Sequence, residues 1–197
     1  MDKFNSKESL KDYLLKNKVE LTGFTDELDE TELSYDEILA NKEEYSITEH
    51  LIISSKEKDL IISFFGSIEN FCKETNVDFV SEEITDNYIE FIHLSDVFKA
   101  DSIKSKGLLA CHCSDVVDLG FGIYAIESND EIALDNLKTF FEDYMYDEVL
   151  VVKGKYNSSY TKCIYGEGRE GYLVLDEDVE PTKLSFKIMK VDDFLCL

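Results

Sequence analysis

The chain has 197 residues and a formal net charge of −23, from 43 acidic and 20 basic side chains. Its hydrophobic content of 44% is enough for the core of one ordinary domain, with or without an extension. Nucleic acid is excluded as an expected partner, and so is an anionic membrane, because such a charge repels phosphate groups. The same charge favours a basic protein as a partner.

Features of the termini and of the cysteines predict a cytoplasmic protein, in the producing cell or in a host cell. The N-terminus MDKFNSKESLKDY lacks the apolar segment of a secretory signal, and no apolar run approaches the roughly 18 residues of a membrane span. The five cysteines are odd in number and follow no repeating framework. Free thiols in a reducing compartment are therefore expected.

A helical N-terminal region is predicted over residues 1–85. Ser6 is a suitable N-cap for a helix that carries Leu10, and a second short helix is expected within 34–45. Apolar residues then recur at steps of three and four between 55 and 75. This spacing predicts one longer amphipathic helix that packs against another element.

Residues 86–197 are predicted to form a second, α+β domain, made of short strands with few helices. Strands are expected at 88–94, 122–126, 148–153, 171–175 and 184–189. Helices are expected at 100–106, ending at Gly107, and at 130–144.

Three segments of this second domain carry candidate functional residues. His93 and Ser95 lie near the end of the first strand, and the segment GFGIY places Gly122 and Tyr124 at the start of the next. The two glycines are not a Rossmann fingerprint, because a third glycine and a following helix are missing. The third segment, GEGREGY at 166–172, holds the only arginine of the chain.

In this order, with SIKSKGL between the first two, the segments resemble the ADP-ribosyltransferases of the diphtheria-toxin and poly(ADP-ribose) polymerase type. The signature of that family is His, Tyr, Glu, and the likeness covers about residues 88–189. It implies a split, mixed β-sandwich that uses NAD as substrate and moves ADP-ribose to a macromolecular acceptor, for which a protein is expected. A divergent bacterial or phage member, acting as a toxin or effector, fits this description.

The resemblance also implies roles for the binding residues. His93 and Ser95 would bind the adenine-side ribose of NAD, and Tyr124 would stack on the nicotinamide ring. Gly122 would let the cofactor approach the backbone closely. Arg169 would contact a phosphate or hold the catalytic carboxylate, tasks that suit a planar and permanently charged group.

The catalytic carboxylate is expected from the GEGREGY segment, because cleavage of the nicotinamide–ribose bond develops positive charge on the sugar. Aligning YLVLD with the family's strand puts the glutamate position on Gly171, and Glu170 is one residue early. A bulge at Gly171 would restore the facing of Glu170, and Glu167 is the second candidate. Leu94 also replaces the glycine that usually follows the histidine.

Several alternatives remain open at this point. Arg169 would be a surface ion pair in the simplest interpretation, with Lys104, Lys106 and Lys155 as rival phosphate contacts. No metal is expected, because Cys111, His112 and Cys113 supply at most part of a site. Two functions are alternatives to ADP-ribose transfer. One is an acidic, non-enzymatic inhibitor or interaction protein on a degenerate transferase fold, and the other is an NAD glycohydrolase.

Overall fold

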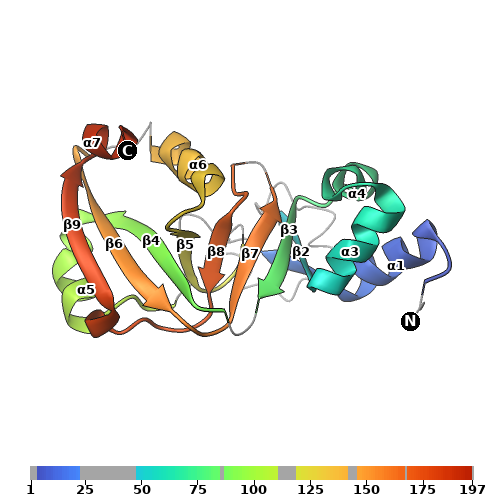
Figure 1. Ribbon diagram of the computed structural model, residues 1–197, viewed down its shortest axis with the longest axis horizontal. Helices are drawn as coiled ribbons and strands as arrows, with labels where there is room; N and C mark the ends of the chain where they lie inside the picture. The colour runs from blue at the N-terminus through green and yellow to red at the C-terminus, as the bar shows by residue number, and fades with distance from the viewer. Residues whose placement is uncertain are drawn as a thin grey trace, which may run out of the picture. The chain divides into compact units, whose positions relative to one another are not determined.

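The computed structural model describes residues 4–22, 48–84, 87–110, 119–141, 146–166 and 168–196. The chain divides into two compact units, which are treated separately below (Figure 1). The first is Met1–Glu83 with His112–Gly120, and the second is Ile84–Cys111 with Phe121–Leu197. In the described part of the chain, no helix is long and apolar enough to cross a membrane.

The first unit contains strands as well as helices, and the helix expected within 34–45 lies outside the described residues. Strand β1 (Val19–Thr22) is antiparallel to β2 (Thr48–Ile53), and β2 is parallel to β3 (Phe79–Ile84). The helices are α1 (Lys7–Asn17), α3 (Ser55–Phe65) and α4 (Ile68–Thr75). The strands escaped the sequence prediction because β3 buries three consecutive residues, 80–82, and a short buried run does not alternate in polarity.

The apolar run over 55–75 forms two helices, so the prediction of a single helix was wrong. Helix α3 ends at Gly66, which has a φ of +84° and donates its N–H to the carbonyl of Ile62. Ser67 then begins α4, because its hydroxyl accepts the N–H of Asn70 at 3.1 Å. The predicted cap at Ser6 is confirmed, since its side chain accepts the N–H of Ser9.

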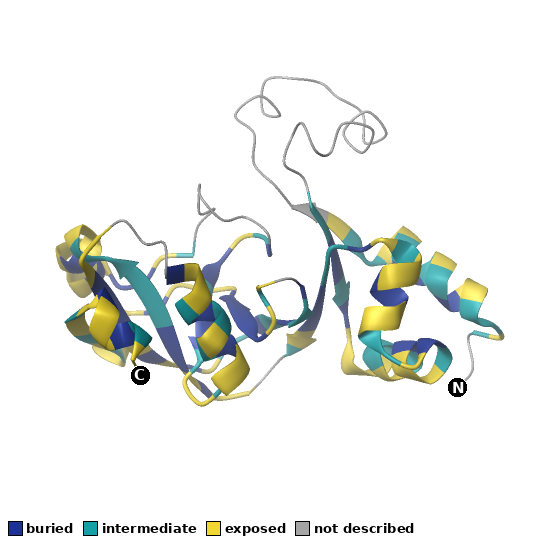
Figure 2. Cartoon of the chain, turned by 90° about the horizontal axis from the view of Figure 1, so that it is seen from above, coloured by how far each residue is buried: buried dark blue, intermediate teal, exposed yellow. Residues whose placement is uncertain are grey.

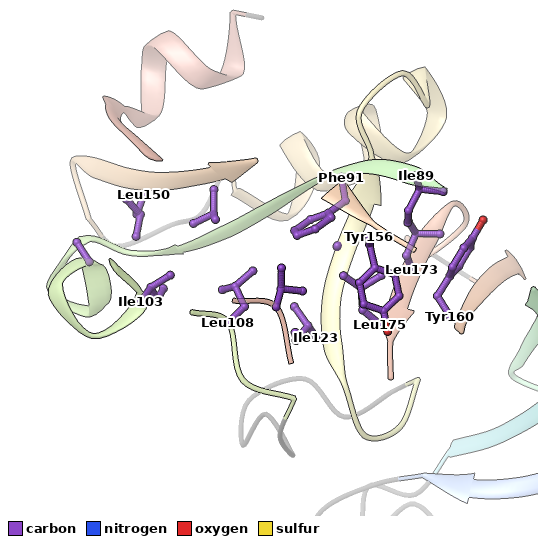
Figure 3. Close-up of a cluster of buried hydrophobic side chains, with 14 residues drawn as sticks. Ile89, Phe91, Ile103, Leu108, Ile123, Leu150, Tyr156, Tyr160, Leu173 and Leu175 are labelled. Carbon is purple, nitrogen blue, oxygen red and sulfur yellow. The ribbon is translucent and has the colours of Figure 1, made fainter. Parts of the chain in front are cut away.

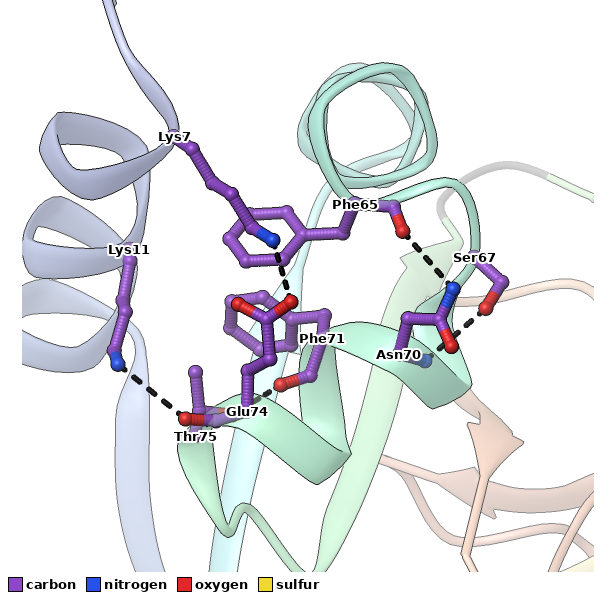
Figure 4. A network of polar contacts seen from close by, with 8 residues as sticks. All are labelled: Lys7, Lys11, Phe65, Ser67, Asn70, Phe71, Glu74 and Thr75. Carbon is purple, nitrogen blue, oxygen red and sulfur yellow. Dashed lines mark hydrogen bonds and ion pairs between the residues drawn. The ribbon is translucent and has the colours of Figure 1, made fainter.

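Contacts between side chains fix α1 against α4 in the first unit (Figure 4). Lys7 forms an ion pair with Glu74 and lies 4.5 Å from the centre of the Phe65 ring. Phe65 meets Phe71 edge to face, with ring centres 5.0 Å apart. Lys11 donates to the carbonyl of Glu74 at 3.3 Å. Two lysines of α1 and an aromatic pair between α3 and α4 therefore join the three helices.

The second unit is built on a sheet with the strand order β7-β8-β5-β4-β6-β9, in which every registered pair is antiparallel. Its strands are β4 (Ile89–Asp96), β5 (Ile123–Glu127), β6 (Glu148–Tyr156), β7 (Tyr160–Tyr165), β8 (Tyr172–Leu175) and β9 (Leu184–Lys190). Its helices are α5 (Ala100–Lys106), α6 (Glu131–Phe141) and α7 (Val191–Leu195), with short 3-10 turns η2 (Val97–Lys99) and η3 (Pro181–Lys183). The mixed α and β class is confirmed, and β7 and α7 were not predicted.

One face of this sheet, together with α5, encloses the main hydrophobic core of the second unit (Figure 3). Phe91 lies at its centre and fills the space beside Gly154, where an added Cβ would lie 2.5 Å from the Phe91 ring. Strands β5, β6 and β8 are mostly buried, whereas the helices expose one side (Figure 2). The core thus fixes β4 and β6, which carry part of the candidate site.

A buried polar pair lies in the first unit, on neighbouring strands. His50 of β2 and Ser81 of β3 are each 1% exposed, and the Nε2 of His50 is hydrogen-bonded to the hydroxyl of Ser81. The Nδ1 of His50 is buried, and none of the residues that the structure describes forms a hydrogen bond with it. Burial lowers the pKa of His50 from 6.5 to about 4, because the protonated ring would be a desolvated charge.

This histidine should make the protein acid-sensitive. The unfolded chain takes up the proton near pH 6.5 and the folded chain only near pH 4, so the contribution of His50 is fully present above 6.5 and is lost as the pH falls. We expect urea unfolding to show a loss of about 2 kcal/mol between pH 7.5 and pH 5 from this group. His50→Gln should remove that part of the pH dependence and Ser81→Ala should retain it. Equal pH dependence in wild type and His50→Gln would contradict this assignment.

Candidate functional site

Strands β4 and β5 separate after a short paired stretch. Only two residue pairs are in register between them, Phe91 with Glu127 and Ile92 with Ile126. Beyond this point β4 continues along β6 as far as Asp96, and β5 continues along β8 back to Ile123. We call this place the fork and define it as residues 93–96 of β4 and 123–125 of β5.

His93 bridges the two arms of the fork. Its Nδ1 lies 2.7 Å from the carbonyl oxygen of Tyr124, which accepts the hydrogen bond. Burial lowers the pKa of His93, the bond to the Tyr124 carbonyl raises it, and the charge of Lys99 lowers it, with a net shift below the ordinary value. The ring is therefore neutral at pH 7 and carries its proton on Nδ1, which leaves Nε2 as a hydrogen-bond acceptor.

The other predicted binding residues lie on the same two strands. Ser95 is partly buried on β4 and pairs with Leu150 of β6. Tyr124 is also partly buried, and it alternates with Ile123 and Ala125, which belong to the core. Its side chain therefore lies on the face of β5 opposite the core.

Gly122 has a structural role that the sequence did not reveal. A Cβ at this position would lie 2.4 Å from a methyl of Val174 and 2.8 Å from the carbonyl oxygen of Leu175. The space beside the Gly122 α-carbon is occupied by β8. The glycine is thus required by the close approach of the neighbouring strand, whatever ligand the fork takes.

The GEGREGY segment enters β8 through a series of turns. The N–H of Arg169 donates to Gly166 O, and the N–H of Tyr172 donates to Arg169 O. The guanidinium carbon of Arg169 lies 5.6 Å from the centre of the Tyr172 ring and 5.4 Å from that of Phe140 in α6. The sequence anticipated a phosphate or carboxylate partner for this arginine, and the structure adds two aromatic rings to its surroundings.

Tyr172 belongs to the same face as Tyr124. The strand register pairs Ile126 with Tyr172 and Tyr124 with Val174, while Leu173 and Leu175 face the core. The hydroxyl of Tyr172 is buried and has no hydrogen-bond partner among the described residues. Burial raises the pKa of this hydroxyl, and Arg169 lowers it, with a net rise.

Gly171 occupies the position that the family resemblance assigns to the catalytic glutamate, and there is no room for a side chain there. Gly171 has a φ of +86°, and a Cβ there would lie 2.6 Å from the Cβ of Ala133 in α6. Glu170 is exposed, and its carbonyl accepts a 2.9 Å hydrogen bond from the side chain of Asn136. Strand β8 begins only at Tyr172, so Gly171 lies in a turn and not in a bulge of the strand. Glu167 lies outside the described residues.

A polar cluster that the sequence analysis missed lies between β5, β7 and the start of α6. Lys162 donates to Asp130 at 2.7 Å and lies 3.6 Å from a carboxylate oxygen of Glu127. Burial raises the pKa of Asp130, but hydrogen bonds from Lys162 and from the N–H of Ala133 lower it to a net value below the ordinary one. The register of β7 brings these residues together, and β7 was not predicted.

The three lysines that were alternatives to Arg169 as phosphate contacts lie at exposed positions. Lys104 and Lys106 lie in the last turn of α5, and Lys155 lies 3.4 Å from a carboxylate oxygen of Glu90. Among the described residues, no group of three or more His, Cys, Asp or Glu side chains is arranged to hold a metal ion. Cys111, His112 and Cys113 lie outside them.

Comparisons with known proteins give no relative for this chain. No protein-family model, curated protein or solved structure matches it.

The contact between Gly171 and Ala133 can be tested by exchange of the two side chains. Gly171→Ala should destabilise the protein by about 2 kcal/mol, because the residue combines a positive φ with a collision against α6. The double variant Gly171→Ala, Ala133→Gly should recover part of this loss beyond the cost of Ala133→Gly alone. Chemical denaturation of all three variants measures this coupling, and strict additivity would show that the two residues do not meet.

Proposed function

We propose that the second unit binds NAD at the fork and transfers ADP-ribose to an acceptor, expected to be a protein. The single observation that carries this proposal is the hydrogen bond from His93 to the Tyr124 carbonyl, at the point where β4 and β5 part. A sheet that divides at this point agrees with the split β-sandwich that the family resemblance implies.

The protonation state of His93 supports a role in ribose recognition. A neutral ring that donates from Nδ1 to Tyr124 presents Nε2 as an acceptor, which suits a sugar hydroxyl. Ser95, two residues along the same strand, adds a hydroxyl that donates or accepts. The ring of Tyr124 lies outside the core and would provide the aromatic face on which nicotinamide stacks. It lies on the opposite face of the sheet from His93 and Ser95, which alternate onto the same face of β4 as Phe91.

The transfer step requires a carboxylate beside the reacting sugar. The bond between the anomeric carbon and the nicotinamide nitrogen breaks, and nicotinamide leaves with the electron pair. The nucleophilic atom of the acceptor forms the new bond to that carbon and loses its proton to the carboxylate or to water. In this proposal Glu170 is the carboxylate, because it is the described glutamate next to the position that the resemblance assigns, and a hydrogen bond from Asn136 holds its backbone.

A second candidate function has its own support. The closed position at Gly171 and the net charge of −23 favour an acidic protein that binds a basic partner without catalysis. Hydrolysis of NAD, with water as acceptor, is a variant of the first proposal. Binding of NAD distinguishes an NAD-using enzyme from an acidic binding protein without catalysis.

Binding is tested by thermal unfolding with and without NAD. At 100 times its dissociation constant, NAD should add about 2.7 kcal/mol to the stability of the wild type. Tyr124→Ala should weaken the binding of NAD by about tenfold, because the ring contact is lost. Tyr88 is an exposed tyrosine of the same domain, and Tyr88→Ala should leave NAD binding unchanged. Absence of any NAD effect on the wild type would reject the proposal and leave the acidic binding protein.

Catalysis is tested with labelled NAD and cell lysate. Glu170→Gln should slow labelling of the acceptor by about 100-fold or more while NAD still stabilises the variant. Glu177→Gln, an equally exposed glutamate after β8, is the matched control and should label at the wild-type rate. Unchanged labelling in Glu170→Gln would remove Glu170 from the mechanism, and nicotinamide release without any acceptor would identify a glycohydrolase.

A further inference from the structure

Two exposed aromatic rings lie side by side on the second unit, at the end of β4 and the start of β6. Phe98 of η2 is 71% exposed and Tyr146 is 51% exposed. Their ring centres are 6.5 Å apart at an interplanar angle of 69°, which is an edge-to-face contact. Exposed apolar residues that adjoin one another are typical of contact surfaces, whereas singly scattered ones are not informative.

The rings border a hollow that is otherwise acidic. It has a volume of about 290 Å³, room for roughly ten water molecules. We call it the Phe98 hollow. Its lining residues are Asp96, Val97, Phe98, Tyr146, Asp147 and Glu148. Residues with three carboxyl groups and two aromatic rings therefore line a space large enough for one long side chain.

The protein's own lysine indicates which chemistry the hollow accepts. The ammonium of Lys99 lies 5.8 Å from the centre of the Phe98 ring and 3.4 Å from a carboxylate oxygen of Asp96. Lys99 itself remains 54% exposed. The carboxylate of Asp96 makes no capping hydrogen bond to η2, although it occupies the N-cap position. The Phe98 ring and the Asp96 carboxylate thus already interact with the same cation, Lys99.

We infer that the Phe98 hollow binds a lysine or arginine side chain from a basic segment of a partner protein. A cation gains from contact with an aromatic ring and from the nearby carboxylates. An apolar partner would instead desolvate the carboxylates without compensation. The net charge of −23 draws such a segment toward the protein, and the hollow provides the specific contact. This inference depends on the hollow alone and is independent of NAD binding at the fork.

The probe is a fluorescein-labelled peptide of alternating lysine and glycine, with the same peptide acetylated on every lysine as its neutral counterpart. Fluorescence anisotropy gives both dissociation constants at low and moderate salt. The lysine peptide should bind, with an affinity that falls as salt rises, and the acetylated peptide should bind at least about tenfold more weakly. Equal binding of the two peptides would overturn the inference in favour of an apolar occupant.

Variants separate the hollow from the general acidity of the surface. Phe98→Ala should weaken the lysine peptide by about fivefold or more, and the exposed ring makes this change harmless to folding. Tyr88→Ala is the matched control, because Tyr88 is 57% exposed and also carries a lysine, Lys155, 5.7 Å from its ring centre. Equal weakening by both substitutions would contradict a specific site.

Substitution of acidic residues tests whether the carboxylates of the hollow contribute to binding of the lysine peptide. Asp147→Asn with Glu148→Gln removes two charges beside the rings, and Asp12→Asn with Asp59→Asn removes two exposed charges from α1 and α3. The first pair should weaken the lysine peptide several-fold and the second by less than about twofold, because only charges near the bound cation escape screening by salt. Equal effects would show attraction by net charge only.

Discussion

The hydrogen bond from His93 to the carbonyl of Tyr124 holds together the part of the second unit on which its proposed chemistry depends. Strands β4 and β5 pair at only two positions, and each then follows a different neighbour. The carbonyl of Tyr124 lies in the arm that has left β4, and the imidazole supplies its partner at 2.7 Å. The same bond fixes the neutral tautomer of the ring, so the geometry of the sheet determines what Nε2 offers to a ligand.

Three cations of the second unit are placed against specific groups of the protein. Lys162 lies between Asp130 and Glu127, Arg169 lies over two aromatic rings, and Lys99 lies between Asp96 and Phe98. These three cations thus interact with their own protein. An anionic substrate would depend on backbone groups and hydroxyls for much of its recognition, whereas a basic partner would meet carboxylates at many positions.

Local signals in the sequence predicted much of the fold. The cap at Ser6, the helix that ends at Gly107 and the strand after Gly122 appear close to where they were expected, because caps, glycines and alternation act over a few residues. The strands of the first unit and β7 were missed, since a strand depends on pairing with neighbours distant in sequence. The contacts of Gly171 with Ala133 and of Arg169 with Phe140 could not be predicted either, because they depend on how α6 lies over β8.

The most direct test of the fork is nitrogen-15 NMR of the histidine rings, which reports separately on Nδ1 and Nε2. The chain contains three histidines, so His93 can be assigned by comparison with His93→Gln. We predict that His93 is protonated on Nδ1 and unprotonated on Nε2 at pH 7, and that NAD shifts the Nε2 resonance as a ribose hydroxyl donates to it. A proton on Nε2 in the free protein, or an Nε2 resonance unchanged at saturating NAD, would contradict the account.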